Sequence, residues 1–277
     1  MKQYQEFTKR LLLLVTPVIA SCVLASSPSK AATFAFSQGK ANFTNFSQSP
    51  RDVGTNTDTN TLTIAKDGMV TALADANATF VGAPPSASNS SLSIALGKGR
   101  DYLGLAESEA TVIGFFDVGA NTNFSFNFNA DLNLQTKIDN PPAENARAAG
   151  DISFALLDTN NNSILDFFSV VGNLTTEGDD DFIAVQKSDN VTLKNQDINF
   201  NFGGKQEFAT VYFDGSLQRY FGNQTNFALI EVKQNRATVK APEPSTSLAL
   251  ILCGGVIGVV LSRRKPTAVL SFVTNKG

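Results

Sequence analysis

The chain has 277 residues, of which 42% are hydrophobic and 17% charged, so it is long enough to fold around a sizeable core. It contains no His, and its two Cys, Cys22 and Cys253, lie in apolar segments near the ends, which excludes Ser-His-Asp triads, Cys nucleophiles in the body, and His or Cys ligation of zinc, haem or iron–sulfur clusters. Residues 33–240 carry 14 basic and 23 acidic side chains, a net charge of −9, which argues against nucleic-acid binding.

Residues 1–32 have the three parts of a secretory signal peptide. Basic residues come first, an apolar run covers residues 11–24, and small residues precede Thr33. We expect cleavage near Ala32 or Thr33 and export of the body from the cytoplasm. An alternative is a lipoprotein signal, because Ile19-Ala20-Ser21-Cys22 resembles a lipobox in which Cys22 is acylated.

The body, residues 33–240, has the period-two pattern of β-strands. Apolar and polar residues alternate over residues 123–134, as expected for a strand with one face packed and the other in water. Shorter alternations recur, separated by turn residues, at 61–64, 91–96, 152–156, 198–202 and 211–213. The pattern predicts an all-β fold.

Twenty of the 22 Phe lie in this body, and Phe is well suited to fill the space between two packed sheets. We therefore predict one domain, a two-sheet β-sandwich of jelly-roll-like type. The Pro-containing breaks at 82–88 and 140–144 are expected to be loops of this domain rather than linkers. The stretch 101–109 is expected to form the one helical turn.

The segment Asp158 to Asp166 offers the best candidate for a metal site. Oxygen ligands from Asp158, Asn160, Asn162 and Asp166 match the early positions of an EF-hand-like calcium loop. Ser stands where that loop has Gly and where it has its bidentate Glu, so a hairpin turn between strands 152–157 and 164–170 is the competing interpretation. We expect no other cofactor.

Paired carboxylates leave a glycosidase as one alternative function. Glu107 and Glu109 are spaced to share one face of a strand, and further candidates are Glu144, Glu207 and Glu231. A calcium-dependent carbohydrate-binding module is the preferred of the two alternatives. Because the body offers only Tyr102, Tyr212 and Tyr220 for stacking on sugar rings, such a module would need a calcium-dependent site at the loop that begins at Asp158. We nevertheless expect a protein that is not an enzyme.

The C-terminal segment has three parts in a fixed order. Pro242-Glu243-Pro244 comes first, an apolar stretch covers residues 247–261, and Arg263-Arg264-Lys265 follows. A helix of about 15 residues rises about 22 Å, less than the roughly 30 Å hydrocarbon core of a bilayer, so the segment suits a transient anchor. The basic residues are expected on the cytoplasmic side, with the prolines beyond the outer face. An ordinary tail anchor is the alternative.

This tail resembles the PEP-CTERM sorting signal of exported Gram-negative and cyanobacterial proteins, with residues 241–265 as the signal and residues 266–277 as an additional cytoplasmic tail. The resemblance implies recognition and cleavage by an exosortase, an integral-membrane processing enzyme, after passage through the general secretion machinery. Such proteins are commonly linked with exopolysaccharide and biofilm matrix. We therefore expect an exported structural or adhesive protein, held transiently in the inner membrane and then placed at the cell surface or outside the cell.

Overall fold

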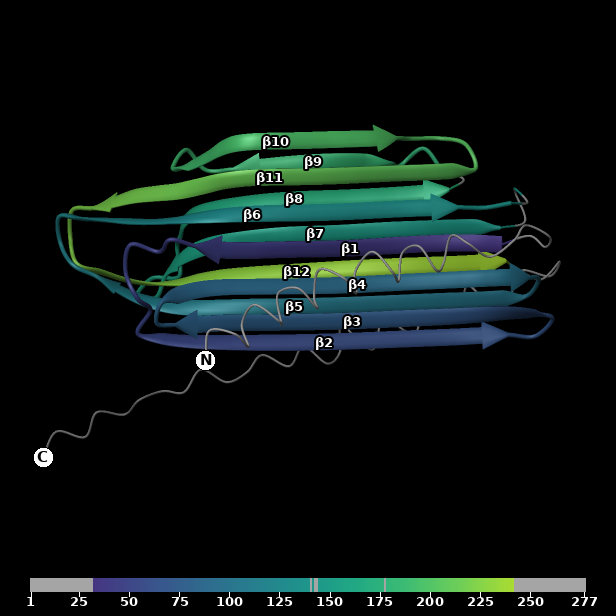
Figure 1. Cartoon of the computed structure of the whole chain (residues 1–277), viewed down its shortest axis with the longest axis horizontal. Coiled ribbons are helices and arrows are strands. Elements are labelled where there is room, and N and C mark those ends of the chain that lie inside the picture. Colours follow the sequence, from purple (N-terminus) through teal and green to yellow (C-terminus); the bar gives the residue numbers. More distant parts are fainter. Residues whose placement is uncertain (1–31, 140, 142–143, 177, 242–277) are drawn as a thin grey trace, which may run out of the picture. The chain divides into compact units, whose positions relative to one another are not determined.

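The structure, a computed structural model, describes residues 32–139, 141, 144–176 and 178–241. These residues contain no helix and form twelve strands (Figure 1). The strands are β1 (Ala32–Thr44), β2 (Asp52–Ala65), β3 (Gly68–Gly82), β4 (Pro85–Gly99), β5 (Tyr102–Val118), β6 (Thr122–Lys137), β7 (Asn145–Asp158), β8 (Ile164–Thr176), β9 (Phe182–Lys187), β10 (Val191–Asn201), β11 (Gln206–Phe221) and β12 (Thr225–Ala241).

The strands form two six-stranded antiparallel sheets. One sheet, sheet A, has the order β10-β11-β6-β1-β4-β3, and the other, sheet B, has the order β2-β5-β12-β7-β8-β9. β4 and β12 come from different sheets and contact each other across the core, as do β1 and β12. The predicted all-β, two-sheet sandwich is therefore confirmed.

The core lies between the sheets and is rich in Phe. β6 shows why: the predicted alternation over residues 123–134 places Phe124, Phe126 and Phe128 inward, each at most 3% exposed, and their polar neighbours outward. These rings pack in edge-on and tilted pairs with other Phe side chains, for example Phe116 with Phe124 at a centroid separation of 4.8 Å. The expectation that Phe fills the space between the sheets is confirmed.

The first and last strands begin and end at the same end of the sandwich. Ala241, the last residue of β12, pairs with Tyr102, the first residue of β5. The hydroxyl of Tyr102 forms a hydrogen bond of 2.5 Å with the Thr33 hydroxyl near the start of β1. A small second core of mostly Ala and Val side chains surrounds Tyr102 at this end.

The expected helical turn at 101–109 is wrong, because β5 begins at Tyr102 and continues through these residues. Leu105 and Ala106 point to opposite faces of β5, and both are buried. The segment therefore lacks the alternation of apolar and polar residues by which the other strands were predicted. Of the expected loop at 82–88, only the turn between β3 and β4 remains, since β4 already begins at Pro85.

Candidate functional site

The candidate site is a set of polar side chains in the middle of the core. β12 lies between β5 and β7, and its inward face presents Glu231, Lys233 and Asn235 toward sheet A. The exposed fractions of these three residues are 0%, 0% and 2%. Because charged side chains are rarely buried this deeply, their contacts decide what the site can do.

Asn89 of β4 meets these side chains from the opposite sheet. The ammonium nitrogen Nζ of Lys233 donates to the backbone oxygen of Asn89 at 3.1 Å and contacts the side-chain oxygen Oδ1 of Asn89. The amide nitrogen Nδ2 of Asn89 donates to Oε2 of Glu231, and to the backbone oxygen of Ala110 at 3.3 Å. We call Asn89, Glu231 and Lys233 the buried triad.

Glu231 and Lys233 also interact directly. Oε1 of Glu231 lies 3.6 Å from Nζ of Lys233, within ion-pair distance, and forms no hydrogen bond with the described residues. The triad thus brings an amine, a carboxamide and a carboxyl group into mutual contact without access to solvent.

Burial changes the proton affinities of both charged members. Loss of solvent raises the pKa of Glu231 to about 7, although Lys233 and Asn89 oppose that rise. The same loss lowers the pKa of Lys233 to about 8, against the opposing effect of Glu231. The two pKa values, ordinarily 4.5 and 10.5, are therefore brought to within about one unit of each other.

The ladder neighbours of the triad are apolar, which explains the strong desolvation. Lys233 pairs in register with Ala110 and Ile152, and Asn89 pairs with Ala41 and Ala78. The strand neighbours on both sides of Lys233 and Asn89 are thus hydrocarbon side chains.

A separate set of hydrogen bonds is centred on Asn235, two residues after Lys233 on β12. The side chain of Asn235 accepts from the Ser91 hydroxyl and donates to the Ser37 hydroxyl at 2.5 Å. Ser37 in turn donates to the backbone oxygen of Ala149 at 2.7 Å, and Ser93 donates to the backbone oxygen of Asn235 at 3.0 Å. These bonds satisfy the amide and fix the strands on both sides of the core.

Two glycines make room for these side chains. A Cβ atom added at Gly39 of β1 would lie 2.7 Å from Cδ of Lys233, and one at Gly150 of β7 would lie 2.9 Å from Nδ2 of Asn235. Both distances are below normal contact. A larger residue at either position would displace the polar side chains of the site.

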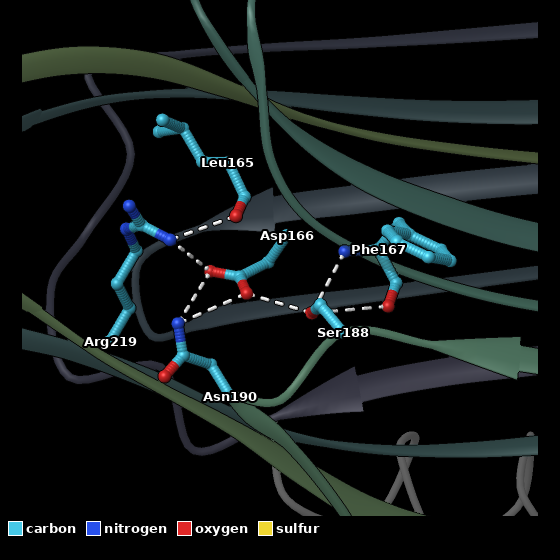
Figure 2. A network of polar contacts seen from close by, with 6 residues as sticks. All are labelled: Leu165, Asp166, Phe167, Ser188, Asn190 and Arg219. Carbon is cyan, nitrogen blue, oxygen red and sulfur yellow. Dashed lines mark hydrogen bonds and ion pairs between the residues drawn. The ribbon is translucent and has the colours of Figure 1, made fainter.

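A second polar network is drawn in Figure 2. It lies between the sheets near the end opposite Ala241. The Asp166 carboxylate of β8, 1% exposed, accepts hydrogen bonds from Ser188 at 2.7 Å and from Asn190 at 3.1 and 3.2 Å. Nη1 of Arg219 on β11 lies 2.9 Å from Oδ2 of Asp166 and donates to the backbone oxygen of Leu165 at 2.8 Å. Asp166 and Arg219 thus join β8 and β11 directly, and Ser188 and Asn190 attach the β9–β10 connection to the same carboxylate.

The structure does not bring the four calcium candidates together around one point. Asp158, Asn160 and Asn162 lie at the tight turn between β7 and β8, where Oδ1 of Asp158 accepts from the backbone nitrogen of Asn160 at 2.8 Å. Asn162 adopts a φ of 59° and donates from its backbone nitrogen to the Asp158 carbonyl at 2.9 Å. Asp166 belongs to the separate network of Ser188, Asn190 and Arg219.

The described residues contain no group of three or more Cys, Asp or Glu side chains arranged to hold a metal ion. The calcium site and the carbohydrate-binding function that depends on it stay predictions. Of the Tyr residues considered for stacking on sugars, Tyr102 is buried, whereas Tyr212 and Tyr220 are 42% and 59% exposed.

Glu107 and Glu109 share the outer face of β5, as their spacing predicts. Oε1 of Glu107 lies 3.4 Å from Nε of Arg236, and Oε2 accepts from Asn60 at 3.1 Å. Glu109 accepts from Gln234 at 3.0 Å. Both carboxylates are thus engaged with neighbouring strands on the half-buried face of sheet B.

The other acidic candidates are buried at separate places. Glu207, at the start of β11, accepts from Thr136 at 3.0 Å and from Thr176 at 2.6 Å. Glu144 accepts from the backbone nitrogen of Asp139 at 3.0 Å in the β6–β7 connection. Glu231 belongs to the buried triad, so these carboxylates do not form one cluster with Glu107 and Glu109.

Residues 1–31 of the predicted signal peptide lie outside the described residues. So does the whole predicted sorting region: the residues Pro242, Glu243, Pro244, Arg263, Arg264 and Lys265, the apolar stretch 247–261 and the tail 266–277. Within the part of the chain that is described, no helix is long and apolar enough to cross a membrane.

No protein-family model, no curated protein and no solved structure matches this chain.

Proposed function

We propose that this chain is an exported protein of the cell surface or extracellular matrix with a structural or adhesive role. One observation carries the proposal: the last residue of β12, Ala241, directly precedes Pro242-Glu243-Pro244 in the sequence. A protease that cuts near these prolines would release the sandwich without breaking a strand. The processing enzyme that fits this tail is an exosortase-like membrane enzyme, acting after the general secretion machinery.

The placement of the chain ends supports tethering by one end. Thr33 and Ala241 both lie next to Tyr102, so the start of β1 and the end of β12 are at the same end of the sandwich. The predicted signal cleavage point and the sorting motif adjoin these two residues in the sequence. The turns at the opposite end would then face away from the membrane. They include residues 45–51, 119–121, 159–163 and 222–224, which are rich in Asn and Ser.

The composition of the body supports a location outside the cell. Residues 33–240 carry a net charge of −9 and no Cys, which favours solubility and makes the fold insensitive to the redox state of its surroundings. Extracellular polysaccharide is the partner that such a location and role favour.

The strand order further supports a sandwich of jelly-roll type. The central strands β4-β1-β6-β11 of sheet A and β5-β12-β7-β8 of sheet B switch repeatedly between the sheets along the chain. This is the order of two Greek keys, with β1 as the strand that closes the arrangement and β2, β3, β9 and β10 added at the edges.

Intact-mass analysis of the protein from its native host tests the proposal. We expect an N-terminus near Ala32 or Thr33, or an acylated Cys22, and a C-terminus near Pro242–Pro244, in material recovered outside the cytoplasm. Recovery of the full-length chain, uncut at both ends, from the cytosol would refute it.

A further inference from the structure

We propose that Lys233 and Asn89 become joined by an intramolecular isopeptide bond, formed with the assistance of Glu231, which links the two sheets covalently. The bond would be an amide between Nζ of Lys233 and Cγ of Asn89. This inference depends on the body alone and holds or fails independently of export and sorting.

The geometry supplies the first argument. Nζ of Lys233 touches the carboxamide of Asn89 from β12, while Glu231, two residues earlier on the same strand, bonds to the nitrogen Nδ2 that would leave. The nucleophile, the acyl group and an acid–base group are thus held by central strands of two sheets. Because the fold already holds these groups in contact, the reaction does not carry the entropy cost of bringing them together.

Attack on Asn89 also requires that Lys233 lose a proton, because only a neutral amine is a nucleophile. In water, moving a proton from a Lys ammonium to a Glu carboxylate would cost the full difference between the ordinary pKa values of 10.5 and 4.5. Inside this core burial lowers the pKa of Lys233 to about 8 and raises the pKa of Glu231 to about 7, so the same transfer costs much less than in water. Burial of the pair therefore favours a neutral Lys233 beside a protonated Glu231, relative to the same groups in water.

Charged side chains on neighbouring strands affect the pKa values of Lys233 and Glu231 less than burial does. Asp131 of β6 slightly favours the charged form of Lys233, and Asp151 of β7 slightly favours the neutral form of Glu231. Both lie on the outer faces of their sheets, since they alternate with buried residues. The triad itself is sealed among apolar ladder neighbours, and water is excluded as a competing nucleophile.

The reaction needs no oxidant, metal or cofactor. Glu231 accepts a proton from the Lys233 ammonium, and the freed electron pair of Nζ attacks Cγ of Asn89 to give a tetrahedral intermediate. A second proton passes from Nζ through Glu231 to Nδ2, the Cγ–Nδ2 bond breaks, and ammonia leaves. Of the five N–H hydrogens of the ammonium and the amide, one stays on the new amide, three leave with ammonia and one remains on Glu231.

The product relieves a cost that the unreacted site carries. A buried ion pair loses the hydration of both ions, and one oxygen of Glu231 has no hydrogen bond within the described residues. After the reaction Lys233 is a neutral amide and Glu231 is a neutral acid that can donate a hydrogen bond. The buried charges disappear while the packing of the stem of Lys233 against Gly39 is kept.

Peptide mapping of the purified full-length chain tests the proposal. Trypsin cuts after Lys and Arg, so an unlinked chain yields peptide 67–98, which contains Asn89, and separate peptides 220–233 and 234–236. An acylated Lys233 is not cut. We expect instead one branched species in which 67–98 is joined to 220–236, with a mass lower than the sum of its parts by one ammonia, about 17 Da.

Three variants sharpen the test. Glu231→Gln keeps both reactive groups but cannot shuttle the proton, and we expect the branched peptide to fall at least tenfold. Asn89→Asp should give a branched peptide of the same mass as the wild type, because water leaves in place of ammonia. Lys240→Arg removes another Lys of β12 outside the core and serves as the matched control, with the branched peptide unchanged.

The wild-type map alone is decisive even if a variant fails to fold. Recovery of free 220–233 and unmodified 67–98 as the main products of folded protein would overturn the proposal. Undiminished branching in a folded Glu231→Gln variant would overturn the role given to Glu231.

Discussion

Arg219 in sheet A and Asp166 in sheet B form an ion pair of 2.9 Å across the sandwich. Their side chains are 27% and 2% exposed, so the carboxylate is sealed from solvent whereas the guanidinium is partly hydrated. The pair closes the end of the core that faces away from Ala241, and it holds the β9–β10 connection through Ser188 and Asn190 (Figure 2).

Removing the guanidinium should therefore destabilise the fold. We expect Arg219→Met to lower the free energy of unfolding by about 2–3 kcal/mol, because Asp166 would be left as a buried, partly uncompensated charge. Arg51→Met is the control: its pair with Asp117, at 3.0 Å, has exposed fractions of 60% and 40% and should contribute less than about 1 kcal/mol. Urea unfolding followed by circular dichroism measures both. Equal losses for the two variants would show that burial of Asp166 does not matter.

The proposed cross-link predicts a large difference in stability. The bond would close a loop between residues separated by 144 positions, which restricts the unfolded chain. By analogy with disulfides that close long loops, its loss in Glu231→Gln should cost about 4–5 kcal/mol. Thermal unfolding monitored by calorimetry provides the measurement. A wild-type chain that unfolds at the same temperature as Glu231→Gln would contradict this expectation.

Gly39 should control how Lys233 reaches Asn89. In Gly39→Ala the new methyl group would lie 2.7 Å from Cδ of Lys233 and must displace that side chain, with an expected loss of about 1–3 kcal/mol. We also expect a smaller fraction of branched peptide. The matched control is Gly54→Ala on β2, where the nearest atom to the new Cβ lies at 3.9 Å. If both variants branch to the same extent, Gly39 has no part in placing Lys233.

Because Tyr102 is buried, we expect the free energy of unfolding to depend on pH in the alkaline range. Burial raises the pKa of its phenol from 10.0 to about 12, so the folded state holds the proton more tightly than the unfolded state. This contribution to stability is fully present below pH 10 and is lost as the pH rises to about 12. The unfolding free energy of the wild type should fall across that window more steeply than that of Tyr102→Phe. Parallel curves for the two proteins would count against it.

Much of the fold could be predicted from the sequence because two-sided strands leave a local pattern. In β6 the inward Phe and outward Asn residues alternate without interruption, and the structure follows that alternation. β5 was mispredicted over residues 101–109 because Leu105 and Ala106 are buried on opposite faces. A strand whose outer face is also partly buried shows no clear period of two in its sequence.

The buried triad was missed for a different reason. The run 231–236 consists of charged and amide residues apart from Val232, which suggests an exposed strand. The residues on both sides of this run nevertheless indicate which of its side chains point inward. The inward face is continued by Phe227, Leu229, Ala237 and Val239. Period two alone would have placed Glu231 and Lys233 inside. That Asn89 lies opposite them depends on how two sheets pack, which no local pattern contains.

The position of β12 has a mechanical consequence. This strand is paired over its length with β5 and β7, and it ends at the residue from which the tail departs. A pull on the tail would act along the strand axis and load both ladders in shear, so that many hydrogen bonds must break together rather than one after another. A domain built this way would resist extraction by flow or drag, and Lys233 lies on the strand that carries the load.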